Sequence, residues 1–199
     1  MKRRTLDLIF SVGGVTLAVL VLVLGLVLQS QANFAEDYVH DQMAEQRIKF
    51  TPEEGLSDEE KEIDCLVENA GKDLLTGKQG ECYANEYIGL HLKDTNDGKT
   101  YAETSNEARA VAAQAEEATG AEKAELEAQA EELNGKVQSL FRGESLRGLL
   151  LTAYGFSIFG ERAGQAALVA YLVAAVLLLA SIAGFVHAAK AKDEVVHLA

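Results

Sequence analysis

The chain contains two long stretches of apolar residues that no charged residue interrupts. The first covers residues 8–28 and reads LIFSVGGVTLAVLVLVLGLVL, and the second covers residues 163–186 and reads AGQAALVAYLVAAVLLLASIAGFV. At a rise of 1.5 Å per residue, about 20 helical residues cross the roughly 30 Å hydrocarbon core of a bilayer. The pattern therefore predicts two transmembrane helices, at 8–28 and 163–186.

A cleaved signal peptide is the alternative interpretation of the first stretch. Lys2, Arg3 and Arg4 resemble the basic start of such a peptide, and the tripeptide at 30–32 has the small residues that signal peptidases accept. However, 21 apolar residues exceed the usual apolar region of about 7–15 residues. The length favours an uncleaved membrane anchor.

The basic residues that flank the two stretches predict the orientation. Lys2, Arg3 and Arg4 precede the first stretch, and Lys190 and Lys192 follow the second. Basic flanks stay on the cytoplasmic side, and two spans place both ends of the chain there without conflict. We therefore expect a multi-pass plasma-membrane protein with cytoplasmic segments 1–7 and 187–199 and an extracytoplasmic domain at 29–162.

The middle segment carries helix-start signals and helical spacing of apolar residues. Ser57 with Glu60, and Thr100 with Glu103, fit the capping box, in which the two side chains satisfy unpaired amides of the first helical turn. A third such pattern begins at Thr119. An apolar stripe with helical spacing lies between the first two starts, at Tyr83, Ala84, Tyr87, Ile88 and His91. The expected fold class is all-α, with two transmembrane helices forming a hairpin and a helical extracytoplasmic domain between them.

Two features of this domain leave alternatives open. Leu126, Leu133 and Leu140 lie seven residues apart, which suits either a coiled coil or a helical hairpin packed on its own domain. Two heptads favour the hairpin, because a coiled coil normally needs three or four. Residues 145–160 form an apolar juxtamembrane helix, which could lie in the membrane interface, turn back as a re-entrant segment, or pack on a stalk formed by 36–47.

The charge balance narrows the classes of partner. The chain has a net charge of −13, and residues 30–162 contain 13 Lys or Arg against 28 Asp or Glu. A nucleic-acid surface needs clustered basic residues, so the sequence predicts no nucleic-acid partner. The acidity is consistent with a soluble domain outside the membrane.

The two cysteines, Cys65 and Cys82, both lie in the middle segment. An even pair in an oxidising compartment is expected to form a disulfide, which would contribute on the order of 3 kcal/mol. A redox-active pair is the alternative, but the spacing is not C-x-x-C.

The remaining chemistry-bearing residues form no recognisable site. Residues 94–98 with Glu103 resemble a calcium loop superficially, but the glycine comes one residue early and the sixth residue after it is Thr104. His40 and His91 lack the partners of a zinc motif, and no nucleophile elbow, Walker loop or dinucleotide fingerprint occurs. The sequence therefore predicts a non-enzymatic protein with no catalytic, cofactor-binding or metal-binding residues.

Small residues within the two apolar stretches suggest how the helices pack. Gly14 and Ala18 are four residues apart on the first helix, and Ala166, Ala170 and Ala174 repeat that spacing on the second. Close backbone approach over small residues drives helix association in lipid, so these five residues are the expected packing positions. The alternative is that alanine simply fills a helix.

Three short motifs resemble a set of uncharacterised small actinobacterial membrane proteins with two spans. They are Asp41-Gln42 followed by Ile48, the run GKTYAE at 98–103, and the run LRGLLLT at 146–152. Members of that family resemble this chain in having an apolar stretch that follows the Leu-Arg pair and continues into the membrane. This chain departs from them at Glu161-Arg162 and in its Ala/Glu-rich region at 106–132. The resemblance implies the same topology and a bacterial envelope location, and no activity.

These observations favour a membrane protein whose outer helical domain binds a partner. Besides the lipid bilayer, the expected partners are another membrane or envelope protein, or further copies of the chain. A sensor or accessory subunit that binds a small ligand or a cell-wall component is the alternative, followed by an envelope enzyme.

Overall fold

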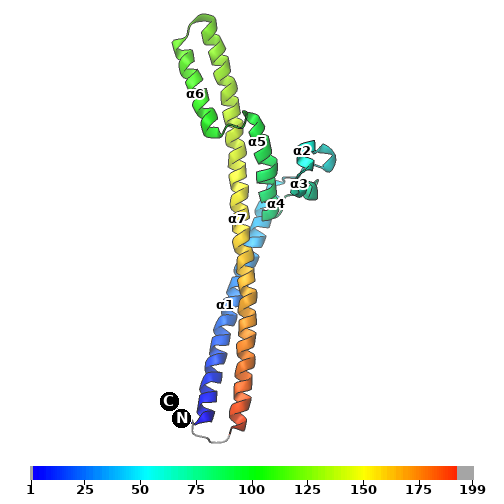
Figure 1. Cartoon of the computed structure of the whole chain (residues 1–199), viewed down its shortest axis with the longest axis vertical. Coiled ribbons are helices and arrows are strands. Elements are labelled where there is room, and N and C mark those ends of the chain that lie inside the picture. Colours follow the sequence, from blue (N-terminus) through cyan, green and yellow to red (C-terminus); the bar gives the residue numbers. More distant parts are fainter. Residues whose placement is uncertain (1, 192–199) are drawn as a thin grey trace. The chain divides into compact units, whose positions relative to one another are not determined.

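The computed structural model describes residues 2–191 of the chain, and its regular structure there is helical (Figure 1). The order of elements is α1 (Arg3–Gln46), η1 (Glu53–Gly55), α2 (Asp58–Lys61), α3 (Asp64–Asn69), α4 (Gly77–Cys82), η2 (Tyr83–Ile88), α5 (Gly89–Thr95), α6 (Tyr101–Glu117) and α7 (Gly120–Lys190). An isolated antiparallel bridge pairs Lys49 with Asp73. The expected all-α class is confirmed.

The chain divides into two compact units. Unit 1 comprises Met1–Asp37 and Ile158–Ala199, of which 2–37 and 158–191 are described, and unit 2 comprises Tyr38–Ser157. The divisions fall within α1, between residues 37 and 38, and within α7, between residues 157 and 158. The predicted segments 1–7 and 187–199 belong to unit 1, and residues 1 and 192–199, Lys192 among them, lie outside the described residues.

In unit 1, α1 and α7 pack antiparallel along a line of small side chains. A Cβ built at Gly14 would meet Ser181, one at Gly25 would meet Tyr171, and one at Gly160 would meet Ala35. Buried positions recur every seven residues on both helices: Ser11, Ala18 and Gly25 on α1, and Gly160, Ala167, Ala174, Ser181 and Ala188 on α7. A seven-residue contact repeat is the coiled-coil seam, here built almost entirely of Gly, Ala and Ser.

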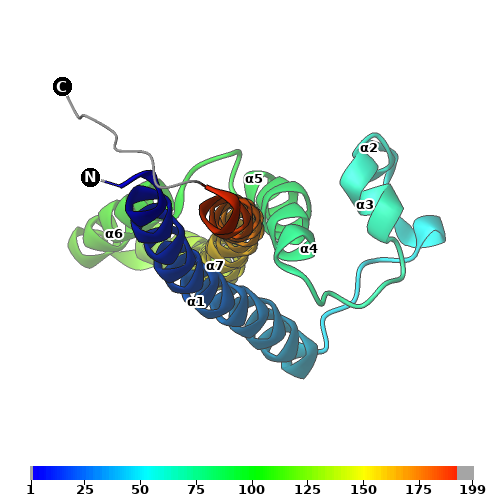
Figure 2. The same ribbon diagram turned by 90° about the horizontal axis from the view of Figure 1, so that it is seen from below.

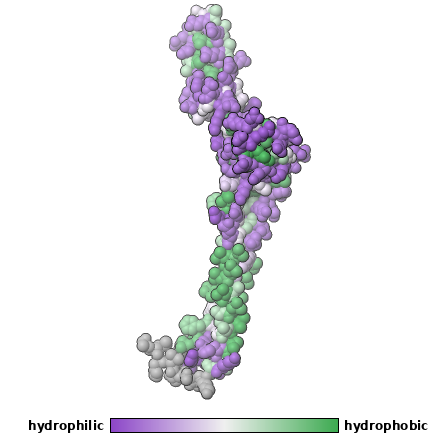
Figure 3. All heavy atoms as spheres, turned by 45° about the vertical axis from the view of Figure 1, so that its right-hand side comes forward, coloured by the Kyte–Doolittle hydropathy of each residue, from purple (hydrophilic) through white to green (hydrophobic). Residues whose placement is uncertain are grey.

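The large apolar side chains of unit 1 lie on its outer surface. Two helices are long and apolar enough to cross a membrane, each with a mean hydropathy of 2.6 over its most apolar 18 residues. Only 17% of that window in α1 and 22% in α7 is buried. Figure 3 shows the apolar surface that results over the paired segments of α1 and α7. A core helix of a water-soluble protein would instead bury its apolar stripe.

The core of unit 2 brings the last part of α1 and the middle of α7 together with the short helices. Val39 and Met43 of α1 and Leu150 of α7 are buried with residues from the intervening segments, namely Phe50, Leu66, Leu74, Cys82, Ala84 and Ile88. α7 continues without a break through 145–160, and the ring of Phe156 meets the ring of Tyr38 edge-on, with centroids 5.8 Å apart. The structure therefore packs this juxtamembrane segment on the expected stalk, without a re-entrant turn.

Capping boxes start three helices of unit 2. Ser57 with Glu60 starts α2 and Thr100 with Glu103 starts α6, as the sequence predicts. A further box, Thr76 with Gln79, starts α4. A new helix also begins where the Thr119 pattern predicts it: α6 ends at Glu117 and α7 begins at Gly120.

The helix α6 and the first part of α7 form an antiparallel hairpin within unit 2, in which they lie side by side (Figures 1 and 2). Its small core consists of Ala108, Leu133 and Val137, with Val111 packed against it. Leu133, the middle leucine of the repeat at 126–140, therefore packs against a neighbouring helix of the same chain. This is the hairpin alternative rather than the coiled coil.

Candidate functional site

A disulfide joins α3 to α4 in unit 2. Cys65 and Cys82 are bonded, with their Cα atoms 6.1 Å apart, so the expected pair is present at disulfide distance. Cys82 is buried in the core, whereas Cys65 is partly exposed. The bond links the two short helices on either side of residues 70–76 and so restricts the loop between them.

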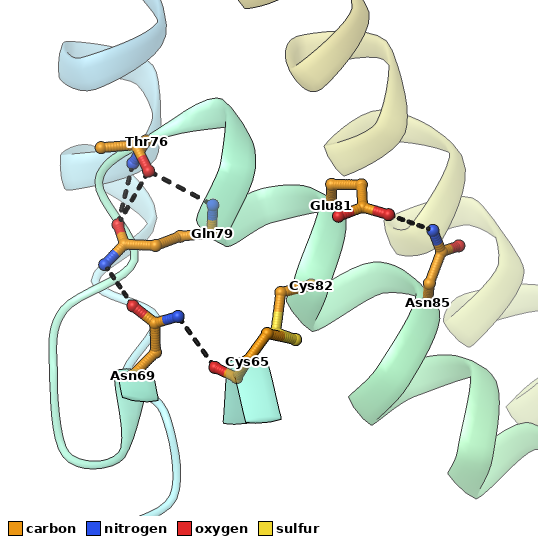
Figure 4. The surroundings of a disulfide bond; sticks show 7 residues. All are labelled: Cys65, Asn69, Thr76, Gln79, Glu81, Cys82 and Asn85. Atoms are coloured by element: carbon orange, nitrogen blue, oxygen red, sulfur yellow. Dashed lines mark hydrogen bonds between the residues drawn. A yellow bond between two sulfur atoms is a disulfide. The ribbon is translucent and has the colours of Figure 1, made fainter. Parts of the chain in front are cut away.

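An amide network reinforces this corner (Figure 4). The Asn69 side chain donates to the Cys65 carbonyl at 2.8 Å and accepts from the Gln79 amide at 3.1 Å. Gln79 Oε1 in turn accepts from the backbone amides of Leu75 and Thr76, at 2.8 and 3.0 Å. The capping glutamine of α4 is therefore shared between its own helix start and the loop that the disulfide closes.

A polar pocket of about 500 Å³ opens beside the disulfide. Glu68, Lys78, Glu81 and Tyr154 line it together with the amide network. Its walls offer charges of both signs and hydrogen-bonding groups of both kinds. Such a lining suits a small polar molecule or a peptide segment better than an apolar ligand.

A row of aromatic side chains runs along the helix formed by α4, η2 and α5. The segment η2 is π-helical, a rare form often found at functional positions. Ring centroids are 5.3 Å apart between Phe50 and Tyr83, 4.7 Å between Tyr83 and Tyr87, and 4.5 Å between Tyr87 and His91. Burial raises the pKa of the Tyr83 phenol, and the neighbouring Tyr87 adds to the shift. The row packs the short helices against one another.

A buried carboxylate lies beside this row. The Glu60 side chain is 6% exposed, and one oxygen accepts from the Ser57 amide at 2.7 Å in the capping box. The other oxygen has no hydrogen bond and lies 3.9 Å from Nε2 of His91. His91 is more exposed than a packing residue, and its Nδ1 lies 2.8 Å from the Tyr87 carbonyl. The His91 ring therefore lies beside the one carboxylate oxygen of Glu60 that the capping box leaves unused.

The turn before α6 uses its acidic residues for capping and ion pairing. Glu103 accepts from the Thr100 amide at 2.8 Å, and this hydrogen bond lowers the pKa of Glu103. Lys99 donates to Glu107 at 2.7 Å, which raises the pKa of the lysine and lowers that of the glutamate. Glu103 serves the start of α6, Asp94 and Thr95 belong to the end of α5, and residues 96–98 form the turn between the two helices. Within 2–191, no group of three or more His, Cys, Asp or Glu side chains could hold a metal ion.

The five predicted packing residues all lie on the two long helices of unit 1, and the structure corrects one of them. Gly14 faces Ser181, and Ala18, Ala170 and Ala174 are buried between the helices. Ala166 is exposed, and its neighbour Ala167 takes the buried position, so that assignment was wrong. The contact repeats every seven residues, from 160 to 167 to 174, and a strict four-residue step drifts off that seam.

Sequence reasoning missed one polar contact at the end of the paired helices. His187 Nδ1 lies 2.8 Å from Asp7 Oδ2, although the residues are 180 positions apart. Asp7 directly precedes the first apolar stretch and His187 directly follows the second, and this placement was the sequence signal that could have suggested the contact.

No family model matches the chain, and neither does any curated protein or solved structure.

Proposed function

We propose that this chain is an integral plasma-membrane protein whose two apolar helices form a transmembrane hairpin. The supporting observation is that the apolar side chains of unit 1 point outward while its small residues face inward. A Leu, Val or Ile side chain gains about 1.5–3 kcal/mol on leaving water, so this surface is unfavourable in solution and favourable in lipid. Packing over small residues is also how helices associate where lipid surrounds them.

The proposed orientation places both termini in the cytoplasm and residues 29–162 outside. Basic residues at the start of α1 and at Lys190 support it through the positive-inside rule. The disulfide between Cys65 and Cys82 supports it independently, because such bonds persist mainly in oxidising compartments. The resemblance to small actinobacterial two-span proteins favours the same placement, in a bacterial envelope.

Unit 2, in this proposal, is a non-enzymatic domain that binds a protein partner or a further copy of the chain. Its most exposed aromatic pair supports this role. Tyr101 and Phe141 lie 5.8 Å apart between ring centroids, with exposures of 42% and 54%. Aromatic side chains are enriched among the residues that dominate binding energy at protein interfaces.

Crosslinking mass spectrometry after mild detergent extraction tests this role. We expect a recurrent crosslinked species for the wild type that is lost in Phe141→Ser and kept in Val67→Ser, a matched change at another exposed apolar position. A wild-type chain that stays monomeric without a recurrent crosslink would exclude the partner-binding role. A crosslink insensitive to both changes would exclude the aromatic pair as its site.

A small-ligand role is the second candidate, and the polar pocket beside the disulfide favours it. A sensor or accessory subunit would use such a pocket to recognise a small polar molecule or a cell-wall fragment. Binding of a soluble peptidoglycan fragment that Lys78→Ala weakens and Lys61→Ala does not would favour this role over partner binding.

A further inference from the structure

A second pocket of unit 2 gathers basic side chains in an otherwise acidic part of the chain. It has a volume of about 220 Å³ and lies between η2 and α5 on one side, the turn before α6, and α7. Lys93, Lys99 and Arg147 line it, and Glu144 is its one acidic lining residue. Residues 30–162 contain more than twice as many acidic as basic residues, so three cations around one small pocket run against the local trend.

Two of these cations are held in position by neighbouring groups. Arg147 donates to the Asn85 side-chain oxygen at 3.1 Å and to Glu144 at 3.4 Å, which ties α7 to η2. Lys99 is fixed by Glu107, which is not among the lining residues. Side chains that are already ordered lose less conformational entropy when a ligand binds.

The pocket also has donor capacity that the described residues do not use. Arg147 Nε is buried without a hydrogen-bond acceptor, and the contacts with Asn85 and Glu144 engage only the two terminal nitrogens of the guanidinium. A guanidinium offers five N–H donors, so each terminal nitrogen of Arg147 keeps one N–H group that Asn85 and Glu144 do not use. Lys93, at the end of α5, makes no ion pair within 2–191. The group that would complete this arrangement is an acceptor carrying negative charge.

We propose that this pocket binds a small anion through a phosphate or carboxylate group. Arg147 supplies directional hydrogen bonds, because its planar guanidinium matches the geometry of both groups. Lys93 and Lys99 supply charge from two other segments. The inference goes beyond the proposed function and does not depend on it, since every residue involved lies in unit 2 and none in the apolar helices.

Titration calorimetry on the full chain in a neutral maltoside detergent tests the proposal, with inorganic phosphate and citrate as separate probes at low salt. We expect saturable one-site binding of at least one probe, weakened by added sodium chloride because the attraction is between charges. The stronger probe identifies whether phosphate or carboxylate is preferred.

Three variants locate the binding. Lys93→Gln and Arg147→Gln should each weaken it about tenfold or more, the loss of one hydrogen bond to a charged group. Lys93 is exposed, so Lys93→Gln is expected to leave the fold intact and remains a valid test even if Arg147→Gln unfolds the domain. Lys136→Gln, a lysine of α7 paired with Glu132 outside the pocket, should bind as the wild type does. Absence of saturable binding by both probes, or binding unchanged in Lys93→Gln, would overturn the proposal.

Discussion

Removing the disulfide tests how unit 2 is stabilised. The change is the double variant Cys65→Ala with Cys82→Ala, chosen because alanine adds no polar atom at the buried Cys82 position. The cysteines are 17 positions apart, and closing a loop of that length restricts the unfolded chain by about 3 kcal/mol. The loss should be close to this value, because the network of Asn69 and Gln79 persists in the variant.

Urea unfolding of the full chain in detergent, followed by tyrosine fluorescence, measures the loss. For a urea dependence of about 1–3 kcal/mol per molar, 3 kcal/mol lowers the midpoint by about 1–3 M. The wild type treated with a dithiol reductant is the control, and its urea midpoint should equal that of the double variant. A wild type whose midpoint does not respond to reductant, or a double variant within about 1 kcal/mol of wild type, would refute the reasoning.

Three further predictions concern packing and pH. Leu150 is 3% exposed in the core of unit 2, so Leu150→Ala should lower the free energy of unfolding by about 2–5 kcal/mol in the same urea assay. Its neighbour Leu149 is 70% exposed, so Leu149→Ala should change that free energy by no more than about 0.5 kcal/mol. Ala174→Leu on the buried seam of unit 1 should lower the thermal midpoint in detergent, since overpacking costs about 1–3 kcal/mol, and Ala175→Leu on the exposed face should not. A lysine hydrogen bond lowers the pKa of Glu107, so its contribution to stability is present above the usual pKa near 4.5 and is lost as the pH falls below it. Glu107→Gln should reduce the acid sensitivity of helicity between pH 6 and 3, and an unchanged acid profile would contradict this.

The sequence predicted those features that depend on local pattern. Uninterrupted apolar runs identified the two long helices, and an S-x-x-E or T-x-x-E pattern identified the starts of α2 and α6. The box at Thr76 with Gln79 follows the same rule with glutamine and was readable, although it was not predicted. These signals can be recognised because each depends only on residues that follow one another along the chain.

Features that depend on how helices meet were not predictable in the same way. Ala166 and Ala167 are identical residues, and only the crossing of α1 and α7 decides which of them is buried. The segment η2 is π-helical, which the spacing of its apolar residues does not indicate, and it buries Ala84 and Ile88 in the core of unit 2. The contact of Arg147 with Asn85 spans 62 positions, so no local pattern could indicate it.

The most direct test of the membrane hairpin is labelling of single cysteines in intact cells with a membrane-impermeant maleimide. The disulfide keeps Cys65 and Cys82 unreactive, so they need not be replaced. Ala113→Cys, on the exposed face of α6, should be labelled in intact cells, and Thr5→Cys, at the start of α1, only after the membrane is permeabilised. Labelling of Thr5→Cys in intact cells, or protection of Ala113→Cys until permeabilisation, would contradict the two-span topology with an external unit 2.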